Sequence, residues 1–203
     1  MGAGFSLARP SPRRIQKFLD RQRREPFSYA EQGATRGPAP PGFTVDRYRV
    51  ELGRGSTVFA RAVEALRLWK MFDLGWVELC WPDAPVEPGS TVAVLTRHYG
   101  FWSLNASRIV YVVDDRGGRP QYGFAYGTLT GHAETGEERF TVEWRPEDDS
   151  VWYAVYAFSR PNGLARLGYP LSRRLQRRFA RDSQEAFRRA VEASLSASPG
   201  VPG

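Results

Sequence analysis

The sequence contains very little cysteine and histidine. One cysteine, Cys80, and two histidines occur among 203 residues. A single cysteine forms no intramolecular disulfide, and so few thiols and imidazoles argue against a structural zinc site. No run of residues is apolar enough to cross a bilayer, and residues 1–10 lack the charged region and apolar stretch of a secretory signal. We therefore expect a cytoplasmic protein that needs no cofactor and no metal.

Motifs of catalysis and phosphate binding are also missing. Residues 53–57 enter a helix through two glycines, but they lack the lysine of a P-loop and the third glycine of a dinucleotide turn. Residues 132–134 match the H-x-E part of a zinc deaminase motif, but the cysteine pair that must follow is absent. Cys80 has no base beside it. The favoured interpretation of residues 53–57 is a capped turn, and that of residues 132–134 is a charged turn. Cys80 is interpreted as a small buried hydrophobic residue.

Aromatic residues, in contrast, are abundant. Six Trp, nine Tyr and twelve Phe make up 13% of the chain, and hydrophobic residues make up 41%. A chain of this length and composition forms one globular domain with a substantial core. Aromatic side chains suit the walls of ligand pockets as well as cores, so a pocket is compatible with this composition.

The positive charge is concentrated at the two ends of the chain. The formal net charge is +7, and every one of the 29 basic residues except Lys17 and Lys70 is arginine. Two basic ends flank an acidic centre, which would suit a nucleic acid or an anionic membrane surface. The favoured interpretation is that these arginines line solvated helix faces, because no exposed aromatic or base-reading motif accompanies them.

The first 42 residues are predicted to form a short helix and an arm. Ser11 is a typical N-cap and Pro12 suits the first helical position, so a short amphipathic helix should run from there to Arg24. Residues 33–42 are rich in glycine and proline, which indicates an extended linker or arm.

From residue 43 the chain is dominated by strands. Ser56 or Thr57 should begin a helix that ends near Phe72, because apolar residues recur at spacings of three and four. Seven segments alternate between apolar and polar residues and are separated by short turns, which predicts an antiparallel meander. These predicted strands are Phe43–Leu52, Val77–Trp81, Thr91–Thr96, Ser107–Asp114, Tyr122–His132, Arg139–Trp144 and Val151–Ser159.

A long arginine-rich helix should close the chain. It is expected to start near Leu164, with a kink at Gly168 and Pro170, and to carry one apolar stripe. The stripe consists of Leu171, Leu175, Phe179, Phe187 and Val191. Seven strands cover such a stripe by curving around it, which predicts an α+β domain over residues 43–195 with a cavity between sheet and helix. Residues 196–203 should form a disordered tail.

Several stretches are similar to a known family. They are Phe27-Ser28-Tyr29, Gly33-Ala34-Thr35, Leu52-Gly53-x-Gly55, Trp69, Phe72, Trp76, Leu104-Asn105-x-x-Arg108-Ile109-Val110-Tyr111, Gly123-Phe124-Ala125-Tyr126-Gly127-Thr128-Leu129-x-Gly131-His132, Gly136-Glu137-Glu138-Arg139-Phe140 and Phe158-Ser159-Arg160-Pro161. Together they resemble uncharacterised protein family 0548 over Ser11 to Val191. That resemblance implies no activity. The order of elements also resembles the helix-grip superfamily of START lipid-binding domains and polyketide cyclases, which implies a fold and a cavity only.

Polar residues within the apolar strands are the candidate ligand-binding residues. An inward polar side chain is costly unless it is paired, so each one either has a structural partner or contacts a ligand. The strand pattern alone does not say which face is inward. The candidates are Asn105, Arg108, Tyr111, Tyr126, Glu143, Tyr156 and Arg160.

Three functions remain open from the sequence. The leading hypothesis is a protein that binds a hydrophobic or aromatic small molecule in the cavity. A cyclase- or hydrolase-like enzyme would use the same cavity, with Glu143 as its inward carboxylate. The third is a basic surface for nucleic acid or anionic membranes. The pattern predicts neither a ligand identity nor an oligomeric state.

Overall fold

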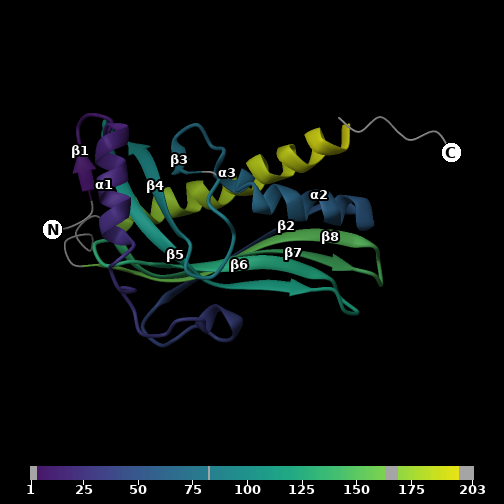
Figure 1. Ribbon diagram of the computed structural model, residues 1–203. Coiled ribbons are helices and arrows are strands. Elements are labelled where there is room, and N and C mark those ends of the chain that lie inside the picture. The colour runs from purple at the N-terminus through teal and green to yellow at the C-terminus, as the bar shows by residue number, and fades with distance from the viewer. Residues whose placement is uncertain (1–3, 82, 163–168, 197–203) are drawn as a thin grey trace.

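The structure is a curved antiparallel sheet that is covered on both faces. The computed structural model describes residues 4–81, 83–162 and 169–196. Helices α2 and α3 lie on one face of the sheet, and the segment that contains η1 lies on the other (Figure 1). The elements are β1 (Gly4–Ser6), α1 (Pro12–Gln22), the 3₁₀ turn η1 (Ala34–Arg36), β2 (Thr44–Arg54), α2 (Ser56–Arg67), the 3₁₀ turn η2 (Lys70–Phe72), β3 (Val77–Cys80), β4 (Thr91–His98), β5 (Phe101–Asp115), β6 (Gln121–Thr128), β7 (Glu134–Arg145), β8 (Ser150–Pro161) and α3 (Tyr169–Ser196).

The strand order follows from the short turns. The sheet runs β2-β8-β7-β6-β5-β4-β3, and β1 pairs with β5 beside this path. From β3 to β8, consecutive strands in the chain are neighbours in the sheet and pair antiparallel, as hairpin connections require. The predicted α+β helix-grip architecture, with a short N-terminal helix and a long C-terminal helix, is confirmed.

Helix α1 packs on the outer face at one end of the sheet. The Ser11 hydroxyl accepts a hydrogen bond from the backbone N–H of Arg14 at 3.4 Å, and Pro12 follows at the first turn. Ile15 and Leu19 are buried against a small cluster from β3, β4 and β5. That cluster consists of Cys80, Ala93, Leu95 and Leu104. The burial of Cys80 agrees with its expected role as a small hydrophobic residue, and it raises the pKa of the thiol to about 12.

The main core lies between the inner face of the sheet and helices α2 and α3. The Phe187 ring of α3 stacks on Tyr153 of β8 with 4.2 Å between centroids and 19° between planes. The Tyr153 hydroxyl lies 3.3 Å from the Ser183 hydroxyl, and Asp182 accepts a hydrogen bond from the Trp76 indole at 3.0 Å. These contacts fix the C-terminal half of α3 over the sheet.

A β-bulge in β5 changes which residues face inward. The pairing of β5 with β6 shifts between Ile109 and Tyr111, so Val110 has no partner on β6. An extra residue in a strand reverses the in–out alternation beyond it. Asn105 and Ile109 face inward, whereas Tyr111 lies outward although it is an even number of residues away.

Some boundaries differ from those expected. The helix that was predicted to reach Phe72 ends at Arg67, because Trp69 adopts a left-handed conformation with φ of 55°. Strand β5 begins at Phe101, not Ser107, and β1 was not predicted. The expected helix start near Leu164, the kink residue Gly168 and residues 197–203 of the expected tail lie outside the described residues.

The stacked pair at the core gives the first testable prediction. Phe187→Ala should lower the free energy of unfolding by about 3–5 kcal/mol, because it removes a fully buried ring and leaves a cavity. Urea denaturation followed by circular dichroism measures the change. Leu68→Ala is the control, since Leu68 is 51% exposed and its loss should change stability by less than about 0.5 kcal/mol. Equal effects of the two variants would contradict this account of the core.

Candidate ligand cavity

A cavity of about 260 Å³ lies between the sheet and the N-terminal half of the described part of α3. Leu175, Phe179 and Ala180 of α3 close it on one side, next to the region where the sequence predicted a cavity. Of the predicted apolar stripe, Phe187 and Val191 are fully buried in the core beyond the cavity. The side chain of Leu171 lies outside the described residues.

Most of the cavity wall is apolar. Phe72 of η2 and Phe179 of α3 face each other with 5.6 Å between their ring centroids. Trp76, Val77 and Val94 continue this wall along the edge formed by β3 and β4. Such a wall favours an apolar or aromatic body, because burying apolar surface is the main driving force for binding in pockets.

One polar part of the wall is a tyrosine–glutamate pair. Tyr126 of β6 and Glu138 of β7 are direct partners across the two strands, and the Tyr126 hydroxyl donates to Glu138 Oε2 at 2.8 Å. Burial raises the pKa of the Glu138 carboxyl from its ordinary value to about 7, and the hydrogen bond from Tyr126 opposes this only in part. Burial also raises the pKa of Tyr126. At neutral pH, both protonation states of the Glu138 carboxyl are therefore populated.

A second set of polar side chains, next to the cavity, joins α3 to the three strands β2, β7 and β8. Arg173 of α3 donates two hydrogen bonds to Asp46 of β2, at 2.6 and 2.8 Å, and a third to Gln176 Oε1 at 2.6 Å. The Gln176 amide then donates to Glu134 of β7 and to Ser159 of β8. Burial raises the pKa of Glu134, while Gln176 and Arg173 lower it. This network holds the helix above the cavity by hydrogen bonds.

The turn between β6 and β7 also lines the cavity. The backbone N–H of Glu134 donates to His132 Nδ1 at 2.9 Å, so that nitrogen is an acceptor. Burial lowers the pKa of His132 to about 4, which leaves the imidazole neutral at pH 7. Residues 132–134 were expected to form a charged turn, and the structure instead places His132 and Glu134 in the cavity wall. Within the described ranges, no group of three or more potential metal ligands occurs.

Two of the seven candidate residues, Asn105 and Tyr126, line the cavity. Asn105 accepts a hydrogen bond from the backbone N–H of Ala133 at 3.2 Å and thereby supports the turn that carries His132. Their contact with a ligand remains a prediction.

The other five candidates do not line this cavity. The Arg108 guanidinium donates to the backbone carbonyls of Gln22, Arg23 and Glu25 at 2.9–3.1 Å, so it caps the C-terminus of α1. Glu143 forms an ion pair with Arg145 at 3.1 Å. Glu143 faces outward because the apolar side chains of its strand, at positions 140 and 142, take the inner face.

The remaining three candidates contact the N-terminal arm or Phe43, the residue that follows it. The Tyr111 hydroxyl lies 2.8 Å from that of Thr35, as the bulge in β5 requires. The Tyr156 hydroxyl donates to the Gly37 carbonyl at 3.2 Å, and the Arg160 guanidinium lies 4.5 Å from the centroid of the Phe43 ring. These residues therefore attach the arm to the outer face of the sheet.

Glu138 is one of several cavity residues that the candidate set missed. The sequence does hold a signal for it, because Glu138 lies two residues before Phe140 and four before Val142, both of which are buried. An acidic residue in phase with the apolar face of a strand must point into the core or a cavity.

Glu137, the preceding residue, is the centre of the contact between arm and sheet. Glu137 is 2% exposed, and its carboxylate accepts hydrogen bonds from the Tyr29 hydroxyl at 2.6 Å and from the backbone N–H groups of Gly33 and Thr35 at 2.8 and 3.0 Å. A Cβ atom at Gly127 would collide with the Tyr29 hydroxyl. Several motifs that carry the resemblance to family 0548 thus form this outer contact.

The sequence of the protein decides its family. A domain of unknown function (DUF1990) matches residues 28–186. The chain belongs to this family. A UPF0548 protein of Dictyostelium discoideum is 36% identical over 92% of this chain and 95% of its own length. A UPF0548 protein of Deinococcus radiodurans is 37% identical over 92% of this chain and 98% of its own length.

Solved structures show how the DUF1990 fold relates to others. The Zhui aromatase/cyclase from Streptomyces sp. R1128 is 13% identical, with a TM-score of 0.53 over 78% of this chain and 99% of its own. At this identity the likeness shows the fold alone, and the fold is the helix grip that the sequence indicated.

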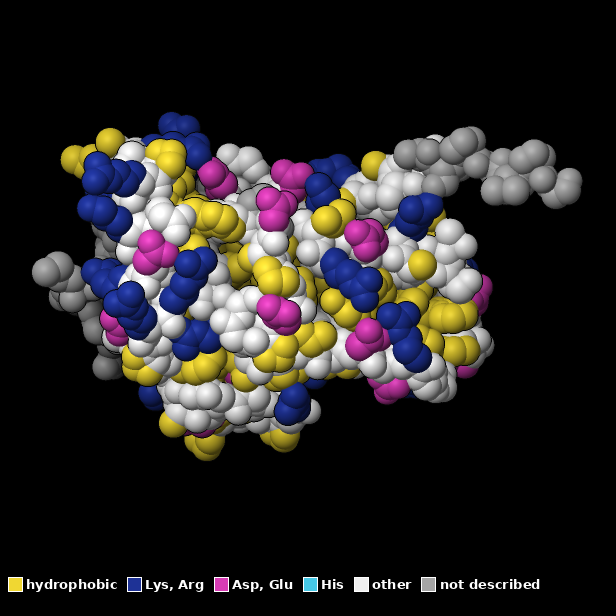
Figure 2. Space-filling model, in the orientation of Figure 1, with side chains coloured by type: hydrophobic (Ala, Val, Ile, Leu, Met, Phe, Trp, Pro, Cys, Tyr) yellow, Lys and Arg dark blue, Asp and Glu magenta, His cyan; other side chains and the backbone are white. Residues whose placement is uncertain are grey.

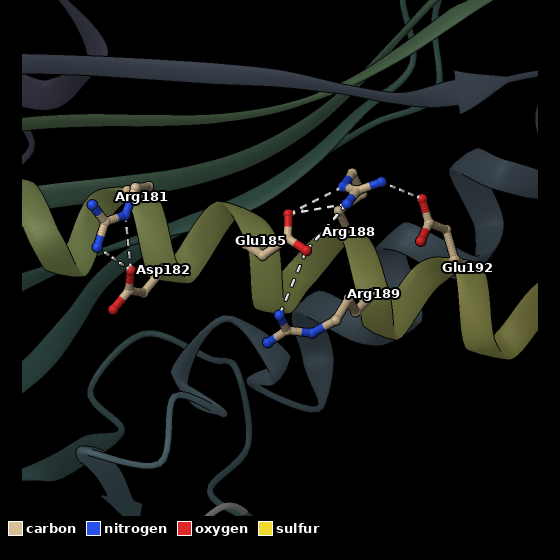
Figure 3. Close-up of polar contacts among 6 residues, drawn as sticks. All are labelled: Arg181, Asp182, Glu185, Arg188, Arg189 and Glu192. Carbon is tan, nitrogen blue, oxygen red and sulfur yellow. Dashed lines mark hydrogen bonds and ion pairs between the residues drawn. The ribbon is translucent and has the colours of Figure 1, made fainter.

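Charges on the surface of this DUF1990 protein are mixed. On the face in Figure 2, the basic side chains over much of the molecule have acidic side chains close by. Figure 3 shows the same along α3, where Arg181 pairs with Asp182 and Arg188 pairs with Glu185 and Glu192. These pairs offset part of the positive charge that the arginines bring to this helix. Among the described residues, no helix is long and apolar enough to span a membrane.

Gly127→Ala tests the contact between arm and sheet. The added methyl group should lower the free energy of unfolding by about 1–3 kcal/mol, because the Tyr29 ring or the strand must move. The loss should be smaller in a Tyr29→Ala background, which urea denaturation of the double-mutant cycle would show. Gly118→Ala is the matched control, since a Cβ there meets no atom within 4 Å. Additive effects of the two substitutions would contradict the contact.

Glu138→Gln tests the buried carboxyl. The pKa of Glu138 is about 7 in the folded protein, against an ordinary value of 4.5, so between these pH values the folded state holds the proton more tightly. The wild type should therefore lose up to about 3 kcal/mol of stability through this group as pH rises from 4.5 to 8. Glutamine does not titrate, so over this pH range the free energy of unfolding of the variant should rise by that amount relative to the wild type. Urea denaturation at several pH values measures the difference, and parallel pH profiles would contradict it.

Proposed function

We propose that this protein binds a small hydrophobic or aromatic molecule in the cavity between the sheet and α3. The observation that supports this is a cavity of about 260 Å³ with aromatic and aliphatic walls and a few buried polar groups. Known ligand pockets combine the same features and begin at about 300 Å³, so a small ligand of one or two rings fits best.

Burial of the polar groups adds to the argument. Tyr126 and Glu138 satisfy each other only in part, since a carboxylate accepts several hydrogen bonds and this one receives a single bond from the described residues. Keeping a partly satisfied carboxyl in an apolar cavity lowers stability. A ligand that donates further hydrogen bonds to the Glu138 carboxyl offsets this loss of stability.

Binding of 1-naphthalenemethanol, a neutral two-ring probe, tests the proposal. Isothermal titration calorimetry should show one site per chain, and the fluorescence of Trp76, which lines the cavity, should change on binding. Ala180→Leu places a larger side chain in the cavity wall and should weaken binding by about tenfold or more. Ala193→Leu, on an exposed position of the same helix, should leave binding unchanged.

Circular dichroism establishes that both variants fold. Absence of binding to the wild type, or equal binding by the two variants, would overturn the proposal.

A second candidate function is acid–base catalysis on the bound molecule. The specific observation is the Tyr126–Glu138 pair in the cavity, with a pKa of about 7 for the glutamate. A general acid or base works best when its pKa lies near the working pH. Glu138 thus takes the role that the sequence assigned to Glu143. This version requires the bound probe to place its hydroxyl within about 3.2 Å of the Glu138 carboxyl, which a crystal structure of the complex tests.

A further inference from the structure

The charges around the cavity are one-sided. Four lining residues carry carboxylates, Asp46, Glu134, Glu137 and Glu138, and the described part of the lining contains no lysine or arginine. The Glu137 carboxylate is occupied by the arm, because Tyr29, Gly33 and Thr35 donate hydrogen bonds to it. Asp46 is neutralised by Arg173, which donates two hydrogen bonds to it. Among the described residues, the hydrogen-bond donor to Glu138 is the neutral Tyr126 hydroxyl, and the donor to Glu134 is the neutral Gln176 amide. Arg173 lies near enough to Glu134 to lower the pKa of that carboxyl, but burial still raises it overall.

The two histidines of the cavity add no positive charge. His132 Nδ1 accepts a hydrogen bond from the backbone, and burial keeps this imidazole neutral. Burial also lowers the pKa of His98. The polar end of the cavity therefore presents two carboxyl groups and several neutral groups to whatever enters it.

Both carboxyl groups retain capacity to accept hydrogen bonds. Each of them uses Oε2 for its one partner among the described residues, which leaves Oε1 of Glu134 and Oε1 of Glu138 available. The two glutamates lie on β7 four residues apart, on the same face of the strand. Hydrogen-bond donors with a positive charge are the groups that such a pair binds most strongly in a water-poor site.

The inference rests on the proposed function. We infer that the cavity selects a protonated aromatic amine, whose rings lie against Phe72, Trp76 and Phe179 and whose nitrogen lies at the end of the cavity that carries Glu134 and Glu138. An amine supplies up to three donors and the opposite charge, so both carboxylates favour its binding. An aromatic carboxylate of the same shape brings a further negative charge into the site and should bind more weakly.

Three probes of matched shape and different charge test the inference. They are 1-naphthylmethylamine, 1-naphthalenemethanol and 1-naphthoate, titrated by calorimetry at pH 8 and low salt. The amine should bind about tenfold more tightly than the alcohol, and the carboxylate about tenfold more weakly. Glu134→Gln and Glu138→Gln should each weaken the amine by about fivefold or more and change the alcohol by less than about twofold.

Glu143→Gln is the matched control, because Glu143 lies on the same strand but on the outer face of the sheet. It should leave all three affinities unchanged. If the amine binds no better than the alcohol, or if its affinity is the same for both cavity variants and the wild type, the inference is overturned while the proposed function stands. Binding of none of the three probes would overturn both.

Discussion

The alternation of β7 sends two consecutive glutamates to opposite faces of the sheet, and both faces depend on it. Glu137 accepts hydrogen bonds from Tyr29, Gly33 and Thr35 of the arm, whereas Glu138 enters the cavity beside Tyr126. A buried carboxyl is tolerated only where hydrogen bonds replace water, so each glutamate needs its own covering layer. The arm outside and α3 inside are these two layers. The strands that form the cavity are therefore held in place by contacts on both the outer and the inner face of the sheet.

Helix α3 has two parts with different physical roles. Around Phe187 it packs against the sheet without space, and the stacked Tyr153 ring fixes its position. Towards its N-terminus the helix is held by Arg173 and Gln176, which donate hydrogen bonds to Asp46 and Glu134. A helix held by polar contacts at one end and by close packing at the other leaves a cavity without loss of order.

Local patterns predicted most of the elements. The Ser11–Pro12 pair marked the start of α1, and the alternation in the seven long strands marked the meander, because a helix cap and a period of two are properties of short segments. β1 was missed because three residues carry no period. The C-terminal helix and the covering of its stripe by a curved sheet also followed from the pattern. Asn105 and Tyr126 were recognised as cavity candidates because both are polar positions in apolar strands.

The sequence by itself thus determined the order of the elements from α1 onward, the helix-grip arrangement and the family. The tertiary structure alone decided which side chains meet in the cavity. A period of two defines two faces of a strand but does not show which one is inward. The bulge at Val110 exchanges the two faces within β5, so Tyr111 lies outside the cavity. Glu138 entered it and Glu143 did not, because the larger apolar side chains of β7 occupy the face toward α2 and α3. Only the packing of distant segments supplies that label.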